Sequence, residues 1–213
     1  MTKQQRIRTI IDISMTILSL ILMGGVYFFS WDGLHEILGV VLLVLWGVHI
    51  FLNYRWYKSV FKGKYNSYRI LQTIINCGIL ICAILLMISG IMLSKYLFSF
   101  LGINFGFSFA RISHLLFSHW YFMFMSLHIG LHASMITKRL GIKFSLLARI
   151  IIALICAYGI FAFISRGIWK YLILQQKFFF FDLEKGYFLF FIDYISIMVL
   201  FATLTSLLAK KLH

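Results

Sequence analysis

Histidine is the residue type in this sequence with the clearest capacity for chemistry. The chain has 213 residues and seven histidines. Six of these fall in two apolar stretches, His35 and His49 in the first and His114, His119, His128 and His132 in the second. Polar side chains are costly inside a membrane, so those that occur there are candidates for function. Because an imidazole can move a proton or ligate a metal, the spacing of the six decides which chemistry is favoured.

The spacing of four of these histidines repeats. His35 and His49 are 14 residues apart, and so are His114 and His128. In an α-helix, two side chains separated in this way lie only about 40° apart around the axis and about 21 Å apart along it. Each helix therefore presents two imidazoles on one face, one near each surface of a membrane.

Two such helices, parallel and facing one another, place four imidazoles as two pairs at two depths. Haem iron takes imidazole nitrogen as an axial ligand, and helix bundles supply such ligands from side chains that project inward. The pattern predicts two bis-histidine b haems. His35 and His114 are the expected ligands of an outer haem, and His49 and His128 are those of an inner haem.

The two remaining histidines of the second stretch fit this pattern less well. His119 lies about 140° around the helix from His114, and we expect it to pack or hydrogen-bond elsewhere in the bundle. His132 follows His128 on the same face, about 6 Å deeper by helical rise. It is an alternative inner ligand, although depth favours His128. Its position also suits contact with a haem propionate, a quinone or a proton pathway.

The composition indicates which elements position these side chains. The chain is 62% hydrophobic and 12% charged, whereas soluble domains carry about 25% charged residues. A soluble enzyme of this size cannot bury so much apolar surface. The net charge of +14 does not indicate nucleic acid as a partner, because the basic residues lie between apolar runs rather than on one polar face. We therefore expect an all-α, polytopic membrane helix bundle in contact with lipid.

Runs of apolar residues predict the number of membrane spans. About 20 predominantly apolar residues in a helix cross the hydrocarbon of a bilayer. We expect a single integral membrane domain over residues 1–213, with about six transmembrane helices and a haem-binding four-helix core. The expected helices cover about residues 8–30, 34–55, 69–95, 110–137, 145–166 and 186–209.

The distribution of Lys and Arg predicts the orientation of the chain. Fourteen of the 20 basic residues fall at the N-terminus, in the second-to-third and fourth-to-fifth connections and at the C-terminus. Cytoplasmic segments are enriched in Lys and Arg. Both termini are therefore expected in the cytoplasm, with the protein in the cytoplasmic membrane. The second and fourth helices then run in parallel, as the paired histidines require.

Several motifs surround the histidines. The second helix and the loop after it contain His35-Glu36-Ile37-Leu38-Gly39, Gly47-Val48-His49-Ile50-Phe51-Leu52-Asn53-Tyr54-Arg55-Trp56-Tyr57 and Phe61-Lys62-Gly63-Lys64-Tyr65. The third helix begins with Tyr68-Arg69-Ile70-Leu71-Gln72-Thr73, and the fourth contains Ser108-Phe109-Ala110-Arg111, His114 and Leu127-His128-Ile129-Gly130-Leu131-His132. Together these motifs resemble the flavinylation-associated cytochrome family, formerly a domain of unknown function. The resemblance covers roughly residues 5–137.

The resemblance implies a membrane b-type cytochrome with two haem b groups. Such a protein carries electrons across the cytoplasmic membrane, from a cytoplasmic or quinol donor to an extracytosolic flavinylated (FMN) protein. The axial roles fall on His35, His49, His114 and His128. The sequence contains no stretch similar to Asp-Gly-x-Thr-Gly-Ala-Thr, the flavin attachment motif, so the FMN belongs to a separate partner. The chain departs from the family at His132-Ala133, where His-Trp is common, and at His119-Trp120, where an aromatic pair is common.

Three charged residues have two interpretations each. Arg111 precedes His114 by one turn and is a candidate partner for an outer haem propionate; the alternative is a role in topology or lipid contact. Asp12, at the cytoplasmic end of the first helix, is either an acid at membrane depth suited to relaying protons or pairing with a base, or a residue of the headgroup zone beside Arg8, which is the favoured interpretation. Asp193, inside the last helix, is an intramembrane acid suited to pairing with a base or relaying protons.

Two other functions are alternatives to this interpretation. A divalent-metal transporter is the main alternative, because imidazole also suits zinc, copper and nickel. Against it, the histidines spread over about 21 Å along each helix, and carboxylates are nearly absent from the spans. The other alternative is a cofactor-free scaffold for the flavin system. The sequence leaves open whether the chain is an enzyme, because quinol oxidation would make it one and no residue locates a quinone site.

Overall fold

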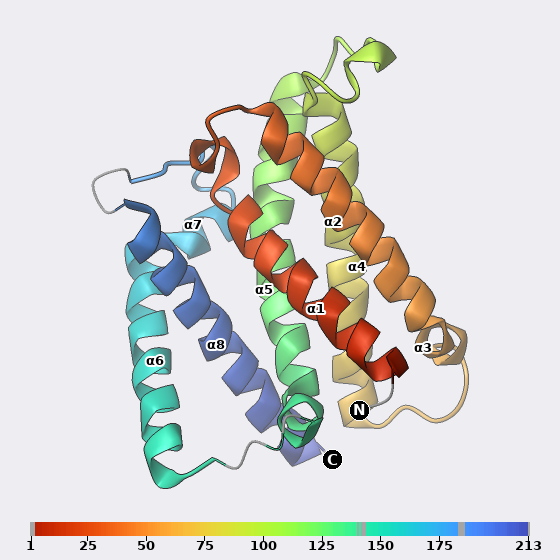
Figure 1. Cartoon of the computed structure of the whole chain (residues 1–213), viewed down its shortest axis with the longest axis vertical. Coiled ribbons are helices and arrows are strands. Elements are labelled where there is room, and N and C mark those ends of the chain that lie inside the picture. The colour runs from red at the N-terminus through yellow and green to blue at the C-terminus, as the bar shows by residue number, and fades with distance from the viewer. Residues whose placement is uncertain (1–2, 140, 142–143, 183–185, 213) are drawn as a thin grey trace.

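The computed structural model describes residues 3–139, 141, 144–182 and 186–212, most of which are helical. The long helices are α1 (Lys3–Leu22), α2 (Gly33–Leu52), α4 (Ser67–Leu93), α5 (Phe107–Arg139), α6 (Leu146–Ser165) and α8 (Gly186–Leu212). Shorter helical elements join them, namely η1 (Gly25–Phe28), α3 (Tyr54–Ser59), η2 (Ser99–Leu101) and α7 (Ile168–Leu172). Figure 1 shows the long helices running side by side.

Four of the long helices, α2, α4, α6 and α8, are long and apolar enough to cross a membrane. Figure 1 shows α1 and α5 alongside them. These two helices are less apolar, because α1 carries Arg6, Arg8 and Asp12 and α5 carries four histidines. The predicted all-α membrane bundle is therefore confirmed. Among the residues that the structure describes, four helices have the length and composition required for a span, against about six expected.

The first helix differs from its prediction at both ends. We expected a helix over residues 8–30, whereas α1 covers Lys3–Leu22. Gly25 has a φ of 62°, a left-handed conformation that glycine adopts without a steric penalty. The chain then continues through the short turn η1. The glycines that follow α1 therefore end the helix and allow the chain to return as α2.

The second helix ends before its expected boundary at residue 55. Asn53 follows the last helical residue, and its side-chain Nδ2 donates to the carbonyl oxygen of His49 at 2.8 Å. The backbone N–H of Asn53 donates to the same carbonyl at 3.1 Å, so both groups of Asn53 close the last turn of the helix. At the start of α4, the side chain of Asn66 accepts from the backbone N–H of Arg69 at 2.9 Å, a typical N-cap.

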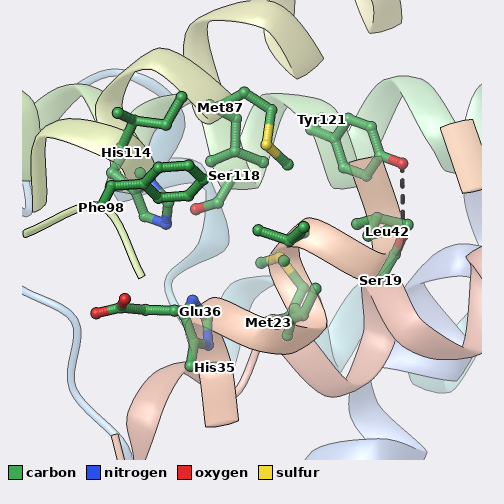
Figure 2. A pocket seen from close by; sticks show the side chains of 16 residues that line it. Ser19, Met23, His35, Glu36, Leu42, Met87, Phe98, His114, Ser118 and Tyr121 are labelled. Carbon is green, nitrogen blue, oxygen red and sulfur yellow. Dashed lines mark hydrogen bonds between the residues drawn. The ribbon is translucent and has the colours of Figure 1, made fainter. Parts of the chain in front are cut away.

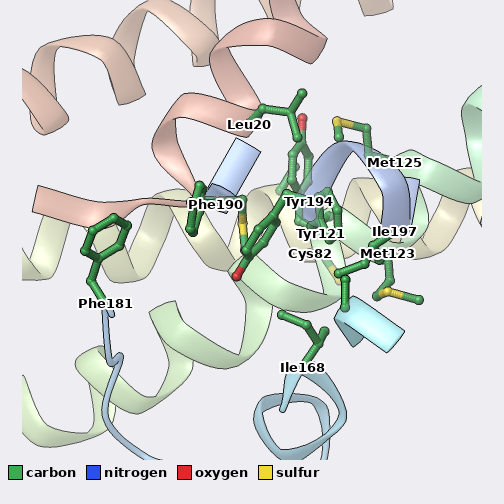
Figure 3. Close-up of a cluster of buried hydrophobic side chains, with 14 residues drawn as sticks. Leu20, Cys82, Tyr121, Met123, Met125, Ile168, Phe181, Phe190, Tyr194 and Ile197 are labelled. Carbon is green, nitrogen blue, oxygen red and sulfur yellow. The ribbon is translucent and has the colours of Figure 1, made fainter. Parts of the chain in front are cut away.

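Helix α5 is central to the packing. It packs against α4 and α8, while α6 packs on α8 and α2 packs mainly on α1. The main cluster of buried hydrophobic side chains (Figure 3) includes Phe122 of α5 and Phe190, Tyr194 and Ile197 of α8. The short helix α7 adds the fully buried Ile168 to this cluster. The core therefore fixes α5 in place through its contact with α8.

The two ends of the bundle carry different elements. Helix α1 begins and α8 ends at the end where α3 lies, which we call the α3 end, and η1 and η2 lie at the opposite end, the η1 end (Figure 1). Both α2 and α5 run from the η1 end toward the α3 end. The two histidine-bearing helices are therefore parallel, as the paired spacing requires.

Candidate functional site

The structure brings the four predicted ligands together as two pairs. The rings of His35 on α2 and His114 on α5 have centroids 6.3 Å apart and planes inclined at 64°. The rings of His49 and His128, nearer the α3 end, also have centroids 6.3 Å apart, with planes inclined at 72°. Each pair thus joins one residue of α2 to one of α5 at the same depth.

This separation fits two imidazoles that share one iron. An imidazole nitrogen lies about 2.0 Å from a transition metal, and its ring centre lies about 1.1 Å behind that nitrogen, so two rings on opposite sides of one metal have centres about 6.2 Å apart. Direct stacking or hydrogen bonding between the rings would bring the centres closer. Both pairs therefore have the separation that a bis-histidine site needs.

A cavity adjoins the pair near the η1 end. It has a volume of about 100 Å³ and is lined by both rings, His35 and His114, together with mostly apolar side chains. Figure 2 shows the two histidines on opposite sides of it. A haem is larger than this volume, so α2, which makes only a few close contacts with α4, would have to move outward to admit one.

Two glycines of α2 leave space beside the helix. A Cβ atom added at Gly39 or at Gly47 would meet nothing within 4 Å. Gly39 also lines the cavity beside His35. A flat group can approach the backbone of α2 at Gly39, so the surroundings of the His35–His114 pair are compatible with a macrocycle. Gly47 is exposed and lies about 160° around the helix from His49, so its open space faces away from the other pair.

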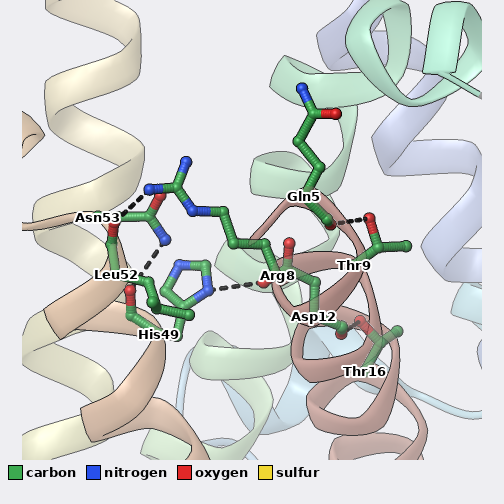
Figure 4. Close-up of polar contacts among 8 residues, drawn as sticks. All are labelled: Gln5, Arg8, Thr9, Asp12, Thr16, His49, Leu52 and Asn53. Atoms are coloured by element: carbon green, nitrogen blue, oxygen red, sulfur yellow. Dashed lines mark hydrogen bonds and ion pairs between the residues drawn. The ribbon is translucent and has the colours of Figure 1, made fainter. Parts of the chain in front are cut away.

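In the pair near the α3 end, both rings are held through Nδ1. The Nδ1 of His49 lies 2.7 Å from Oδ1 of Asp12 on α1 (Figure 4). The Nδ1 of His128 lies 2.8 Å from Oδ1 of Asn76 on α4. Because a carboxylate and an amide oxygen only accept hydrogen bonds, each Nδ1 carries the proton. The Nε2 atom of each ring is then the nitrogen free to bind a metal, an arrangement common for metal-ligating histidines.

The pair near the η1 end is held more weakly. The Nδ1 of His114 lies 3.2 Å from Oγ of Ser89 on α4. That hydroxyl donates its own proton to the carbonyl oxygen of Leu86 at 2.9 Å, so it accepts from His114. The Nδ1 of His35 is buried and has no hydrogen-bond partner among the described residues. Helices α1, α2, α4 and α5 together therefore supply the two pairs and their polar supports.

The other two histidines of α5 occupy different surroundings. The ring of His132 lies 4.7 Å from that of His128, so it is a neighbour of the pair on the same helix. His119 is 1% exposed and stacks on Tyr171 of α7 with ring centres 4.2 Å apart. Its Nδ1 donates to the carbonyl oxygen of Leu115 at 2.8 Å. His119 therefore packs away from the two pairs, as its angular position predicts.

Two of the charged residues singled out in the sequence, Arg111 and Asp193, contact identified side chains in the structure. Arg111 is exposed and lies over the ring of Phe178, 5.4 Å from its centre, and it is not among the residues lining the cavity. Asp193 accepts hydrogen bonds from Arg166 Nε at 2.7 Å and from Tyr158 OH at 2.6 Å. Asp193 on α8 is thus paired with Arg166, the residue that follows the last residue of α6.

Asp12 lies one turn after Arg8 on α1, and the two side chains make different contacts. Its carboxylate contacts His49 across the gap between α1 and α2, while Arg8 Nη2 donates to the carbonyl oxygen of Leu52 at 2.7 Å. Both side chains connect α1 to the C-terminal end of α2 (Figure 4). The acid therefore belongs to the surroundings of the histidine pair.

Sequence reasoning did not identify Asn76 and Ser89 as part of the site. Both are polar side chains inside an otherwise apolar helix, α4, and that is the one sequence signal that could have found them. They do not repeat the 14-residue interval of the histidines. Their role depends on how α4 packs against α5, which the sequence pattern does not encode.

Comparisons with known proteins do not identify a family for this chain, so its function is argued from the geometry of the site. No family model matches the chain, and no curated protein or solved structure matches it either. Among the residues that the structure describes, no three His, Cys, Asp or Glu side chains form a cluster able to hold a metal ion.

Proposed function

We propose that the protein is a membrane b-type cytochrome whose helices α2 and α5 bind two haem b groups. The observation that carries this proposal is the repeated ring separation of 6.3 Å, found in two histidine pairs from the same two helices. One chance contact between histidines would mean little. Two contacts with equal separation, at two depths, match the requirement for two bis-histidine sites.

The residues around the pairs have distinct tasks in this proposal. The supports on α1 and α4 hold the Nδ1 protons of His49, His114 and His128 and direct Nε2 of these rings toward the space between α2 and α5. Apolar side chains along the cavity keep water away from the ligands. Bound at the two pairs, the haems would supply a one-electron relay across the membrane. Arg111 is proposed as a propionate partner, reached by rotation of its exposed side chain away from Phe178.

The proposal includes six membrane spans, with α1 and α5 crossing beside the four apolar helices. The α3 end, which holds the start of α1, the end of α8 and most of the basic residues, then lies in the cytoplasm, and the η1 end lies outside. The His49–His128 pair becomes the inner site and the His35–His114 pair the outer site. His132 stays an alternative inner ligand, since it neighbours His128.

Membership of the flavinylation-associated cytochrome family is part of the same proposal, on the motifs of residues 5–137. It makes an extracytosolic flavoprotein with covalent FMN the acceptor, and a cytoplasmic reductant or a quinol the donor. The chain acts as an electron carrier, and oxidation of a quinol at the membrane would make it an enzyme as well.

Absorbance spectroscopy of the purified protein tests the proposal. The chain is expressed with haem available, and a reduced-minus-oxidised spectrum is recorded with haem and metal quantitation. We expect b-type bands and about two haems per chain in the wild type. His114→Ala should lose about one of them, whereas the matched variant His119→Ala, on the same helix, should keep both. Absence of b-type bands in the wild type, or zinc without haem, would overturn the proposal, the second result favouring a transporter.

A further inference from the structure

The two histidine pairs differ in the charge of their polar supports. At the His49–His128 pair, a carboxylate contacts one ring directly, because Asp12 lies 2.7 Å from Nδ1 of His49. The side chain of Asp12 is 49% exposed and that of His49 is 24% exposed. Partial exposure screens the charge, but a hydrogen bond of this length still transmits it to the ring.

At the His35–His114 pair, the supports are neutral or missing. His114 has the hydroxyl of Ser89, and Nδ1 of His35 has no partner among the described residues. The nearest carboxylate, Glu36, accepts hydrogen bonds from Ser94 Oγ at 2.6 Å and from three backbone N–H groups between residues 95 and 97. Figure 2 shows its oxygens directed away from the ring of His114. Its charge is therefore offset by donors in the loop after α4.

The basic residues gathered at the α3 end act against Asp12, but among the described residues none is joined to either ring of the pair by a hydrogen bond or ion pair. The guanidinium of Arg8, on the same helix as Asp12, donates to the carbonyl oxygen of Leu52, the last residue of α2. This hydrogen bond is to the backbone of α2 and to neither ring of the pair. Asp12, by contrast, is bonded to a ligand ring, so its influence on the ligand is direct.

A carboxylate bonded to Nδ1–H makes the imidazole a stronger electron donor and stabilises the oxidised state of a bound iron. An apolar, water-free surrounding has the opposite effect, because it favours the redox state with less net charge. The carboxylate contact is found at His49, where it lowers the reduction potential at the α3 end. The mainly apolar lining is found at the cavity beside His35 and His114, where it raises the reduction potential at the η1 end. Both effects make the potential at the α3 end the lower of the two.

We infer that Asp12 is a positioning residue that makes the His49–His128 site the lower-potential of the two haem sites. This inference rests on the proposed function. The order of potentials favours the passage of one electron from the α3 end to the η1 end, with no bond formed or broken. The electron comes from a cytoplasmic or quinol reductant and leaves to an extracytosolic flavin. The chain therefore has a built-in outward direction of electron transfer.

Redox titration of the haem-loaded protein in lipid nanodiscs tests the inference. The absorbance of the reduced α band is followed against potential, and the wild type is expected to show two one-electron steps. Asp12→Asn keeps an acceptor oxygen beside His49 and removes the charge. It should raise the midpoint of the lower step and leave the upper step unchanged, while Asp12→Glu, which keeps the charge, should restore a lower step close to that of the wild type.

Asp32→Asn is the matched control. Asp32 precedes α2 at the opposite end of the bundle and is 50% exposed, and its carboxylate lies 3.8 Å from Lys95 Nζ. Its neutralisation should leave the lower step unmoved. His35→Ala, which keeps only the inner site, assigns the steps, since the step that remains should coincide with the lower one of the wild type.

The inference is overturned if Asp12→Asn moves neither step or moves only the upper one, or if the step left in His35→Ala is the upper one. Those outcomes leave the proposed function intact, because two b-type haems are still present. A wild-type protein without b-type bands overturns the proposed function instead, so the two failures are distinguishable.

Discussion

Helix α5 packs tightly against α8 on one side and faces a more open space before α2 on the other. Glycines have opposite roles at these two sides. A Cβ atom at Gly130 would clash with the carbonyl oxygen of Ala202 on α8. At Gly39 on α2, it would meet nothing within 4 Å. The same residue type therefore permits close helix packing in one region and leaves room for another group in the other.

The tight side has the features of a stabilising core. Phe122 of α5 and Ile197 of α8 are completely buried. Nearby, Gly159 of α6 packs on α8 so closely that a Cβ atom would lie 2.5 Å from the carbonyl oxygen of Ser196. Small residues allow helix backbones in membranes to approach in this way, and close packing then stabilises the bundle. This region holds α5 in place.

The open side has the features of a binding region. Its polar side chains include the histidine pairs and their supports, and α2 is attached to the bundle mainly through α1. A region with few packing contacts is less stable locally and better able to accept a ligand. The comparison indicates that stability and binding are separated onto the two sides of α5, and the following four predictions test that separation.

The largest loss of stability is expected from Arg166→Met. It leaves the carboxylate of Asp193 buried without its cation, and the side chains of the pair are 10% and 8% exposed. Removing one partner of a buried ion pair costs about 3–5 kcal/mol, which thermal unfolding in detergent would measure. Adding Asp193→Leu should recover much of that loss. A single variant as stable as the wild type would contradict the role given to the α6–α8 side.

The next largest effect is expected from Gly130→Ala. The added methyl group meets Ala202 and Thr205 on α8, and overpacking of this kind costs about 1–3 kcal/mol. The change in unfolding temperature of the purified protein is the measurement. Unchanged stability would mean that α5 and α8 are less closely packed than described.

A smaller effect is expected from Asn76→Ala. It removes the acceptor for Nδ1 of His128, and the loss of one buried hydrogen bond costs about 1 kcal/mol. Haem content should fall at the inner site, because the ring is no longer oriented. Thr73→Ala, one turn earlier on α4, serves as the control for both readouts. Equal haem content in the two variants would argue against a supporting role for Asn76.

The smallest effect, and one of opposite sign, is expected from Gly39→Ala. Because the added methyl group has no neighbour within 4 Å, the gain in helix propensity should raise stability by about 0.5–1 kcal/mol. Gly39→Leu should keep the fold and lower the haem content by filling the space beside His35. A marked loss of stability in Gly39→Ala would show that the open side is packed, and would remove the contrast with Gly130.

Much of the fold could be predicted from local patterns. Runs of apolar residues predicted the six long helices, because the apolar pattern of a helix depends only on the residues of that helix. The boundaries near Gly25 and Asn53 were missed, since a left-handed glycine and a side-chain cap depend on atomic geometry. The membrane count also depends on context, because α1 and α5 carry polar residues whose placement only the packing reveals.

The amino-acid sequence by itself determined that four histidines fall on two helical faces at matched intervals, because helix periodicity relates residues within one element. Which rings meet, and what holds them, was decided by the tertiary structure. Asp12 and Asn76 come from helices that share no repeat with α2 or α5, and their contacts arise only when α1 and α4 pack beside the pairs. Local spacing sets the depth of each histidine, and the packing of neighbouring helices sets its hydrogen bonds.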